Sequence, residues 1–137
     1  SKLNFPIVLL GGKDEKKNGD EIIQLSKRDG ILNLCGQVSI NQSAYLIKHS
    51  NYLFTNDTGL MHIGSAFNKK IISFWGCTKP HLGFYPYVDA SNSLMIVSEK
   101  SERQCSKHGS SCRFTDEGCV KEIDSQEMIN RIEKFIS

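Results

Sequence analysis

The sequence lacks a strong excess of charge of either sign, and it lacks long hydrophobic runs. Seventeen Lys and Arg residues stand against fifteen Asp and Glu residues, which leaves a formal net charge of +2. A charge this small argues against nucleic acid or an anionic membrane surface as the partner. The apolar runs, such as residues 7–10, are far shorter than the ~20 residues that a membrane-spanning helix needs. We therefore expect no nucleic-acid binding and no spanning segment.

Internal repeats and low-complexity tracts are also missing from the 137 residues. That length suits one domain of ordinary size with a real hydrophobic core. The first residues lead directly into a strand-like run and do not have the pattern of a secretory signal peptide. The five cysteines, an odd number, favour a reducing compartment. We expect a single domain, residues 1–137, that works in the cytoplasm.

What the sequence does contain is a regular alternation of strand and helix patterns. Short apolar runs predict strands at residues 6–10, 31–34, 52–55, 71–75 and 94–97. Helical periodicity predicts helices at residues 20–28, 39–47, 60–68 and 124–136. Most of the strands are continuously apolar, which is typical of strands covered on both faces. The fold class is therefore predicted as α/β, with a parallel sheet between two layers of helices.

Some details of these helices can be predicted from capping and spacing. Asp20 is expected to cap the first helix. In the helix at 60–68, the side chains of Ile63, Ala66 and Phe67 are expected to face the core. In the last helix a similar stripe contains Met128, Ile132 and Phe135. The polar stretch at 98–122, rich in serine and cysteine, is expected to form an ordered lobe without clear periodicity.

The most informative stretch is 52–76, where a predicted strand runs through a polar turn into a helix. Ligands of open parallel sheets bind beyond the carboxyl ends of strands. A helix N-terminus at that edge offers unpaired N–H groups to a phosphate, and Gly59 would let an anion approach the backbone. Thr58 adds a hydroxyl, while Asp57 suits neutral sugar hydroxyls and His62 lies on the first helical turn. Alternatively, Asp57 is only an N-cap and His62 an ordinary polar residue.

Residues 56–76, NDTGLMHIGSAFNKKIISFWG, resemble the motif of the glycosyltransferase family 9 heptosyltransferases. The resemblance continues through Thr78, Pro80, Phe84, Pro86 and Tyr87. Upstream, residues 7–12 with the acidic position after them, and residues 33–40, are similar to further family segments. The match covers residues 5–87 in all. It implies an enzyme that transfers heptose from ADP-heptose to a lipopolysaccharide core acceptor.

The resemblance also implies a fold and a set of partners. The family has the GT-B fold, two Rossmann-like domains with the active site between them, and this chain resembles the C-terminal, donor-binding domain without its first strand and helix. The lipid-linked saccharide acceptor and the general base would then belong to the missing N-terminal domain. The expected location is the inner face of the inner membrane, where peripheral association would bring the enzyme to its acceptor. No cofactor is implied, and the chain alone is expected to bind donor weakly and to turn over nothing.

The resemblance assigns roles to residues on both sides of the diphosphate. Thr58, Gly59 and Leu60 would hold the donor diphosphate, and His62 would offset charge as the nucleotide leaves. Asp57 would accept hydrogen bonds from the transferred sugar.

The nucleoside end of the donor is assigned to three further residues. Asp14 or Glu15 would face the ribose hydroxyls, and Val38 would line the adenine slot. The alternatives are that both acids are simply solvated and that Val38 is an ordinary core valine.

A cluster of metal-ligating residue types lies in the lobe at 98–122. Three thiols and one imidazole could complete a tetrahedral zinc site, at Cys105, His108, Cys112 and Cys119. Their spacing matches no standard zinc motif, so a disulfide or free thiols are the alternatives. The two cysteines outside the lobe, Cys35 and Cys77, are expected to be small buried residues.

Two other functions stay open at this stage. One is another GT-B glycosyltransferase or an epimerase that uses a UDP- or GDP-sugar. The other is a non-catalytic module that binds a nucleotide or zinc.

Overall fold

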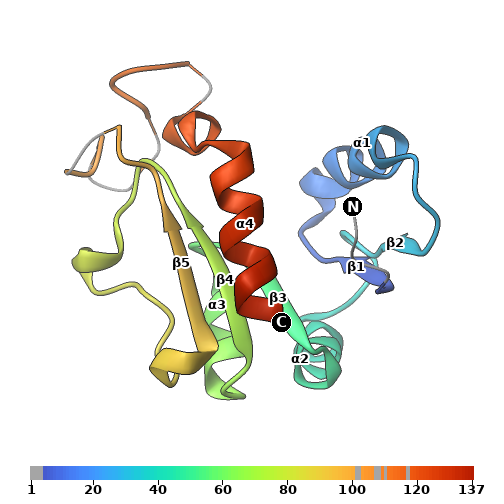
Figure 1. Cartoon of the computed structure of the whole chain (residues 1–137). Coiled ribbons are helices and arrows are strands. Elements are labelled where there is room, and N and C mark those ends of the chain that lie inside the picture. Colours follow the sequence, from blue (N-terminus) through green and yellow to red (C-terminus); the bar gives the residue numbers. More distant parts are fainter. Residues whose placement is uncertain (1–4, 101–102, 107–108, 110, 117) are drawn as a thin grey trace. The chain divides into compact units, whose positions relative to one another are not determined.

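The computed structural model describes residues 5–100, 103–106, 109, 111–116 and 118–137 (Figure 1). Its contacts group into two compact units, residues 1–45 and residues 46–137, and each is described by itself. The boundary falls inside helix α2 (Ile40–His49). No helix in the described part of the chain has the length and apolar character needed to cross a bilayer.

The first unit is built on two short parallel strands, β1 (Ile7–Leu9) and β2 (Ile31–Asn33). Between them the chain forms a 3₁₀ turn, η1 (Lys13–Glu15), and helix α1 (Lys16–Ser26). The prediction that α1 begins after an Asp20 N-cap is wrong, because the helix begins four residues earlier. Asp20 is instead an interior residue whose carboxylate accepts a hydrogen bond from Lys16 at 2.8 Å.

Gly19 explains why α1 passes so close to β2. A Cβ atom at this position would come within 2.5 Å of the Asn33 side chain, so only glycine allows the approach. The amide of Asn33 is buried there and donates to the carbonyl of Lys16 at 2.9 Å and to Asp20 at 2.7 Å. A helix-weakening glycine is therefore tolerated because it brings α1 into contact with a buried, fully bonded amide.

The second unit contains a three-stranded parallel sheet, which confirms the predicted parallel strands for this part of the chain. Its strands are β3 (Tyr52–Asn56), β4 (Lys70–Trp75) and β5 (Ser93–Val97), in that order across the sheet. The connections contain helix α3 (Gly59–Ala66) and the 3₁₀ turns η2 (Pro80–Leu82) and η3 (Ala90–Asn92). The chain closes with the 3₁₀ turn η4 (Cys119–Glu122) and helix α4 (Ser125–Ile136).

The two faces of this sheet pack against different helices. Ile71 and Trp75 point to one face, where they pack with Met61 of α3. Ile72 points to the other face, where it packs with Ile96 and with Ile132 of α4. This alternation follows from the two-residue period of a strand. It gives the second unit the predicted helix–sheet–helix layering, visible around β4 in Figure 1.

The face that α3 turns to the core differs from the prediction. Met61 and Gly64 are its buried residues, whereas Phe67 is 39% exposed. The reason is steric, because a Cβ at Gly64 would come within 2.5 Å of Leu53. The side of the helix that packs contains Gly64 beside the large Met61, and hydrophobicity alone does not reveal that Gly64 belongs to it. In α4 the predicted stripe of Met128, Ile132 and Phe135 is confirmed.

Candidate functional site

The N-terminus of α3 lies at the carboxyl end of β3 and is open. Thr58 is the N-cap residue, and its side chain makes no capping hydrogen bond in the described structure. The N–H of Met61 donates to the carbonyl of Thr58 at 3.1 Å. Among the described residues, no acceptor contacts the N–H groups of Gly59 and Leu60, the first two of the helix. Gly59 is exposed, and a Cβ placed on it would have no atom within 4 Å.

Asp57 and His62 lie on either side of this open turn along the chain. Asp57 is half-buried and precedes the N-cap, so the alternative that it caps α3 is wrong. His62 is exposed on the first turns of the helix. The Thr58 hydroxyl lies 3.2 Å from that of Thr55, within hydrogen-bond distance. The turn therefore combines free amide donors, hydroxyls, one carboxylate and one imidazole in consecutive positions.

A solvent-open hollow of about 340 Å³ lies at the same edge of the sheet. Asp57 lines this hollow. In the described part of the chain, the residues that follow it in the predicted site do not line the hollow, namely Thr58, Gly59, Leu60 and His62. The remaining residues of the wall come from the ends of β3 and β4 and from the cysteine lobe, and they are Asn56, Phe74, Gly76, Cys77, Thr78, Gly109, Gly118, Cys119 and Val120. The carboxyl edge predicted from the strand order is thus hollowed beside Asp57.

The wall of this hollow depends on a very close contact between β4 and the lobe. Gly76 follows β4, and a Cβ on it would come within 2.5 Å of the Val120 side chain and 2.8 Å of its backbone nitrogen. Nearby, the N–H of Ser98 donates to the carbonyl of Trp75 at 2.8 Å. The ammonium of Lys79 is buried and donates to the carbonyl of Ser98 at 2.7 Å. These contacts fix the chain on both sides of the hollow.

The residues predicted to contact the nucleoside lie in the other unit. Glu15 accepts a hydrogen bond from the N–H of Gly12 at 2.7 Å and so closes its own turn. Asp14 is exposed in the same turn, and Val38 is half-buried before α2. The role of these residues in donor binding stays a prediction.

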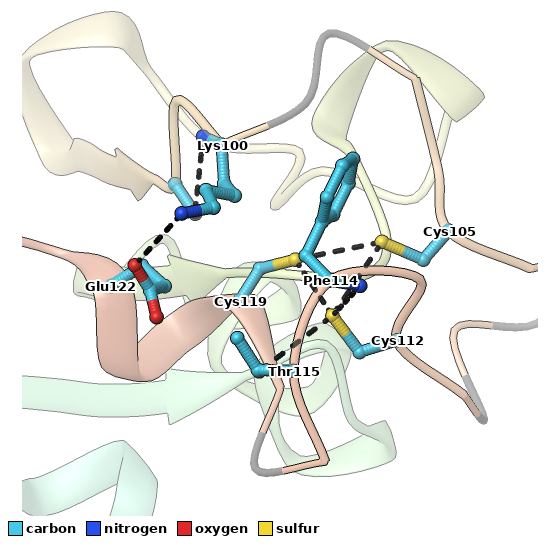
Figure 2. A network of polar contacts seen from close by, with 8 residues as sticks. Lys100, Cys105, Cys112, Phe114, Thr115, Cys119 and Glu122 are labelled. Atoms are coloured by element: carbon cyan, nitrogen blue, oxygen red, sulfur yellow. Dashed lines mark hydrogen bonds and ion pairs between the residues drawn. The ribbon is translucent and has the colours of Figure 1, made fainter.

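Four cysteine sulfur atoms converge beside the hollow. The Sγ atoms of Cys77, Cys105, Cys112 and Cys119 all lie within 4.8 Å of one another. Figure 2 shows three of them, those of Cys105, Cys112 and Cys119, directed toward one another. The prediction that Cys77 is a small buried residue is wrong, because Cys77 is half-buried, and its sulfur is the fourth of this cluster. His108, the fourth ligand of the predicted set, lies outside the described residues. The other cysteine, Cys35, is buried as expected.

Backbone contacts give these thiols different acidities. The backbone N–H of Phe114 contacts the sulfur of Cys112 at 3.5 Å, and this contact, followed by that with Cys119, lowers the pKa of the Cys112 thiol to about 6. Burial raises the pKa of the Cys119 thiol above its ordinary range. The arrangement thus favours negative charge at Cys112 over Cys119.

Sequence reasoning missed that Cys77 joins the cysteine cluster and that glycines of the lobe line the hollow, and it missed both for the same reason. Cys77 follows β4, far along the chain from the lobe, and it meets the lobe through tertiary contacts. These include the packing of Val120 on Gly76 and the hydrogen bond from the N–H of Cys105 to the carbonyl of Cys77. The signal that was present is positional: a residue just past a parallel strand lies at the edge where ligands bind. Applied to Gly76 and Thr78, this rule also explains why both line the hollow.

Known proteins are similar to this chain over most of its length. Residues 2–115 match the family model described as "Glycosyltransferase family 9 (heptosyltransferase)". Lipooligosaccharide heptosyltransferase 2 of Haemophilus influenzae is 26% identical over 88% of this chain and 37% of its own length. The protein of the same name from Campylobacter jejuni serotype O:6 is 27% identical over 97% of this chain and 43% of its own length. The chain thus spans well under half the length of these relatives.

Solved structures show the same fold. Escherichia coli ADP-heptose lps heptosyltransferase II superposes with a TM-score of 0.70 and 21% identity, over 93% of this chain and 35% of that one. The glycosyl transferase family 9 protein of Veillonella parvula gives a TM-score of 0.71 at 18% identity, with the same coverage. An Escherichia coli heptosyltransferase solved with ADP gives 0.63 at 16% identity, over 94% of this chain and 33% of that one.

Proposed function

Because the chain belongs to glycosyltransferase family 9 (heptosyltransferase), we propose that it is the donor-binding part of an enzyme that transfers heptose to a lipopolysaccharide core. The observation that carries this proposal is the open N-terminus of α3 beside Asp57, at the carboxyl edge of the sheet. Unpaired N–H groups and the positive end of the helix dipole suit a diphosphate. A glycosyltransferase needs such a site to stabilise its leaving group.

We propose the following roles around the diphosphate. The N–H groups of Gly59 and Leu60 and the hydroxyl of Thr58 hold its oxygen atoms. His62, exposed on the same helix, offsets the charge that develops as the nucleotide leaves. Asp57 would repel a phosphate, so its carboxylate accepts hydrogen bonds from hydroxyls of the transferred sugar. Helix amides and an imidazole supply the charge stabilisation, so the proposal requires no cofactor.

The favoured donor is ADP-heptose. The relatives are heptosyltransferases, and one structure of the same fold was solved with ADP. Asp14 is assigned to the ribose, whose vicinal hydroxyls suit a carboxylate, and Val38 to the adenine. Glu15 is the weaker candidate because its carboxylate already accepts the N–H of Gly12.

The other half of the reaction is assigned to protein outside this chain. Inverting transfer needs a general base that takes the proton of the acceptor hydroxyl, and the proposal places that base and the lipid-linked saccharide acceptor in the remainder of the enzyme. The acceptor is carried by lipid, so we place the enzyme in the cytoplasm at the inner face of the inner membrane. The chain by itself is then expected to bind donor and to turn over no substrate.

Calorimetric titration of the chain with ADP, UDP and GDP tests the proposal. ADP should bind most tightly. The variant Gly59→Ala should bind it roughly tenfold more weakly, because its methyl group holds the phosphate away from charge-assisted donors. The variant should still fold, since the space around Gly59 is open. Ser125→Ala, at the first position of α4, is the matched control.

Two results would contradict parts of the proposal. Equal ADP affinity of Gly59→Ala and the parent chain would show that the N-terminus of α3 is not the diphosphate site. Tighter binding of UDP or GDP than of ADP would replace ADP-heptose by a UDP- or GDP-sugar as donor, and binding of none of the three would remove the donor-binding function.

A further inference from the structure

We propose that Cys77, Cys105, Cys112 and Cys119 bind a structural zinc ion that fastens the lobe at 98–122 to the end of β4. This inference does not rest on the proposed function, since it concerns how the lobe is held.

The positions of the sulfur atoms carry the proposal. Four of the six separations between Sγ atoms are 3.9 Å for Cys77–Cys119, 4.0 Å for Cys105–Cys112, 3.5 Å for Cys105–Cys119 and 3.1 Å for Cys112–Cys119, and the other two are within 4.8 Å. Four ligands about 2.3 Å from a zinc ion lie about 3.8 Å from one another at the corners of a tetrahedron. The observed values scatter around that length.

A pair of disulfides fits the same positions less well. A disulfide holds its two sulfur atoms about 2.05 Å apart and draws them away from other thiols. Here each cysteine of the cluster is a free thiol. All four sulfur atoms lie close to one another. Two disulfides would require closeness only within each bonded pair, and not between the pairs. Mutual proximity of four thiols is the arrangement that a single central ion explains.

Contacts around the cluster suit thiolates bound to a metal. The N–H of Phe114 is directed at the sulfur of Cys112, 3.5 Å away, and the hydroxyl of Thr115 lies 3.9 Å from the same atom (Figure 2). Such outer contacts orient the ligands and offset their negative charge. A further contact fixes two ligands by their backbone, because the N–H of Cys105 donates to the carbonyl of Cys77 at 2.9 Å.

Four sulfur ligands make the site structural. A catalytic zinc ion keeps one position for water or substrate, whereas four protein thiolates close the coordination sphere. Cys105 and Cys119 are also buried, at 4% and 0% exposure. The described part of the lobe before η4 contains no helix or strand that could hold it otherwise. On binding, each thiol gives up its proton, so zinc uptake releases protons to the solvent.

Metal analysis of the purified chain tests this inference. The chain, reconstituted with zinc under reducing conditions and then desalted, should contain one zinc ion per molecule. Each of the variants Cys77→Ser, Cys105→Ser, Cys112→Ser and Cys119→Ser should fall well below that ratio. Cys35→Ser, the same substitution outside the cluster, should retain the ion. His108→Ala should also retain it, which separates the four-thiol set from a set with one imidazole.

A second measurement covers the case in which a variant fails to fold. The unmodified chain with cobalt in place of zinc should show a strong sulfur-to-cobalt charge-transfer absorption and the ligand-field bands of a tetrahedral site. A chain that takes up neither metal overturns the proposal. So does an intact mass, without reductant, that shows disulfides among the four cysteines in place of bound metal. Zinc retained by Cys77→Ser but lost from His108→Ala would overturn the assigned ligand set.

Discussion

Two helices of the same unit begin in opposite ways. At α4, the carboxylate of Asp124 accepts the N–H of Glu127 at 2.7 Å and so caps the helix. At α3, Thr58 makes no such bond in the described structure, and the turn is open. Capping stabilises a helix, and an uncapped end keeps its donors available. The difference agrees with the proposal that the start of α3 binds an anionic ligand, whereas the start of α4 is closed by its cap.

The open helix is held by burial instead. Met61 of α3 is completely buried in the core that contains Ile71 and Trp75. A helix anchored in this way does not need a cap to stay folded. The comparison therefore predicts that α3 and α4 respond differently to loss of burial and to loss of a cap.

The largest effect is expected from Met61→Ala. Removing this buried side chain should lower the free energy of unfolding by about 2–5 kcal/mol, because a cavity remains beside Trp75. Ile129→Ala, on an exposed part of α4, should cost less than about 1 kcal/mol. Urea unfolding of both variants measures the difference, and equal losses would show that α3 is not anchored by Met61.

Removal of the proposed zinc ion should affect the two helices unequally. The lobe leads through η4 directly into α4, whereas α3 is connected to β3 and β4. After treatment with a chelator, hydrogen exchange should become faster in the lobe and in the first turn of α4. Exchange in α3 and β4 should stay unchanged. Uniformly faster exchange would mean that the ion holds the whole unit, and no change would argue against the ion.

Loss of the cap should cost α4 more than α3. Asp124→Ala removes a bonded N-cap and should lower the free energy of unfolding by about 1 kcal/mol. Thr58→Ala removes no capping bond and should change that energy by less than about 0.5 kcal/mol. Thermal or urea unfolding compares the two, and a larger loss for Thr58→Ala would reverse the interpretation of both helix ends.

A small stability change of opposite sign, and the sharpest test, is expected from Thr58→Asp. A carboxylate at this N-cap should raise the free energy of unfolding by about 0.5 kcal/mol through the helix dipole. The introduced carboxylate should also weaken ADP binding, because it occupies the place of the diphosphate and repels its negative charge. Thr58→Asn introduces a cap of similar size without a charge. Comparing the ADP affinities of the two variants therefore separates steric blocking of the site from charge repulsion. Unchanged ADP affinity in Thr58→Asp would mean that the open helix end is not the phosphate site.

The sequence predicted much of this second unit because its signals are local. Continuous apolar runs identify β3, β4 and β5, and Asp124 identifies the start of α4. The errors occur where a distant contact decides the outcome. Gly64 packs against Leu53, so α3 turns the side with Met61 and Gly64 to the core instead of the predicted side with Phe67. Gly19 is tolerated inside α1 because Asn33 fills the space it leaves.

In the candidate site, too, features set by local sequence were predicted and features set by distant contacts were not. The turn at 56–59 is contiguous, so its chemistry could be predicted from residue types alone. The sulfur cluster is not contiguous, because Cys77 meets the lobe through tertiary contacts such as the packing at Gly76. No pattern of spacing within the lobe indicates a partner so far upstream.

The contact between Gly76 and Val120 has a consequence for how this protein can evolve. Three glycines contribute to the wall of the hollow, so part of that surface is main chain. A main-chain surface cannot be reshaped by exchanging one side chain for another. Relatives that accommodate a different molecule beside Asp57 would have to lengthen, shorten or re-anchor the lobe, and we expect insertions and deletions to concentrate there while the strand ends keep their residues.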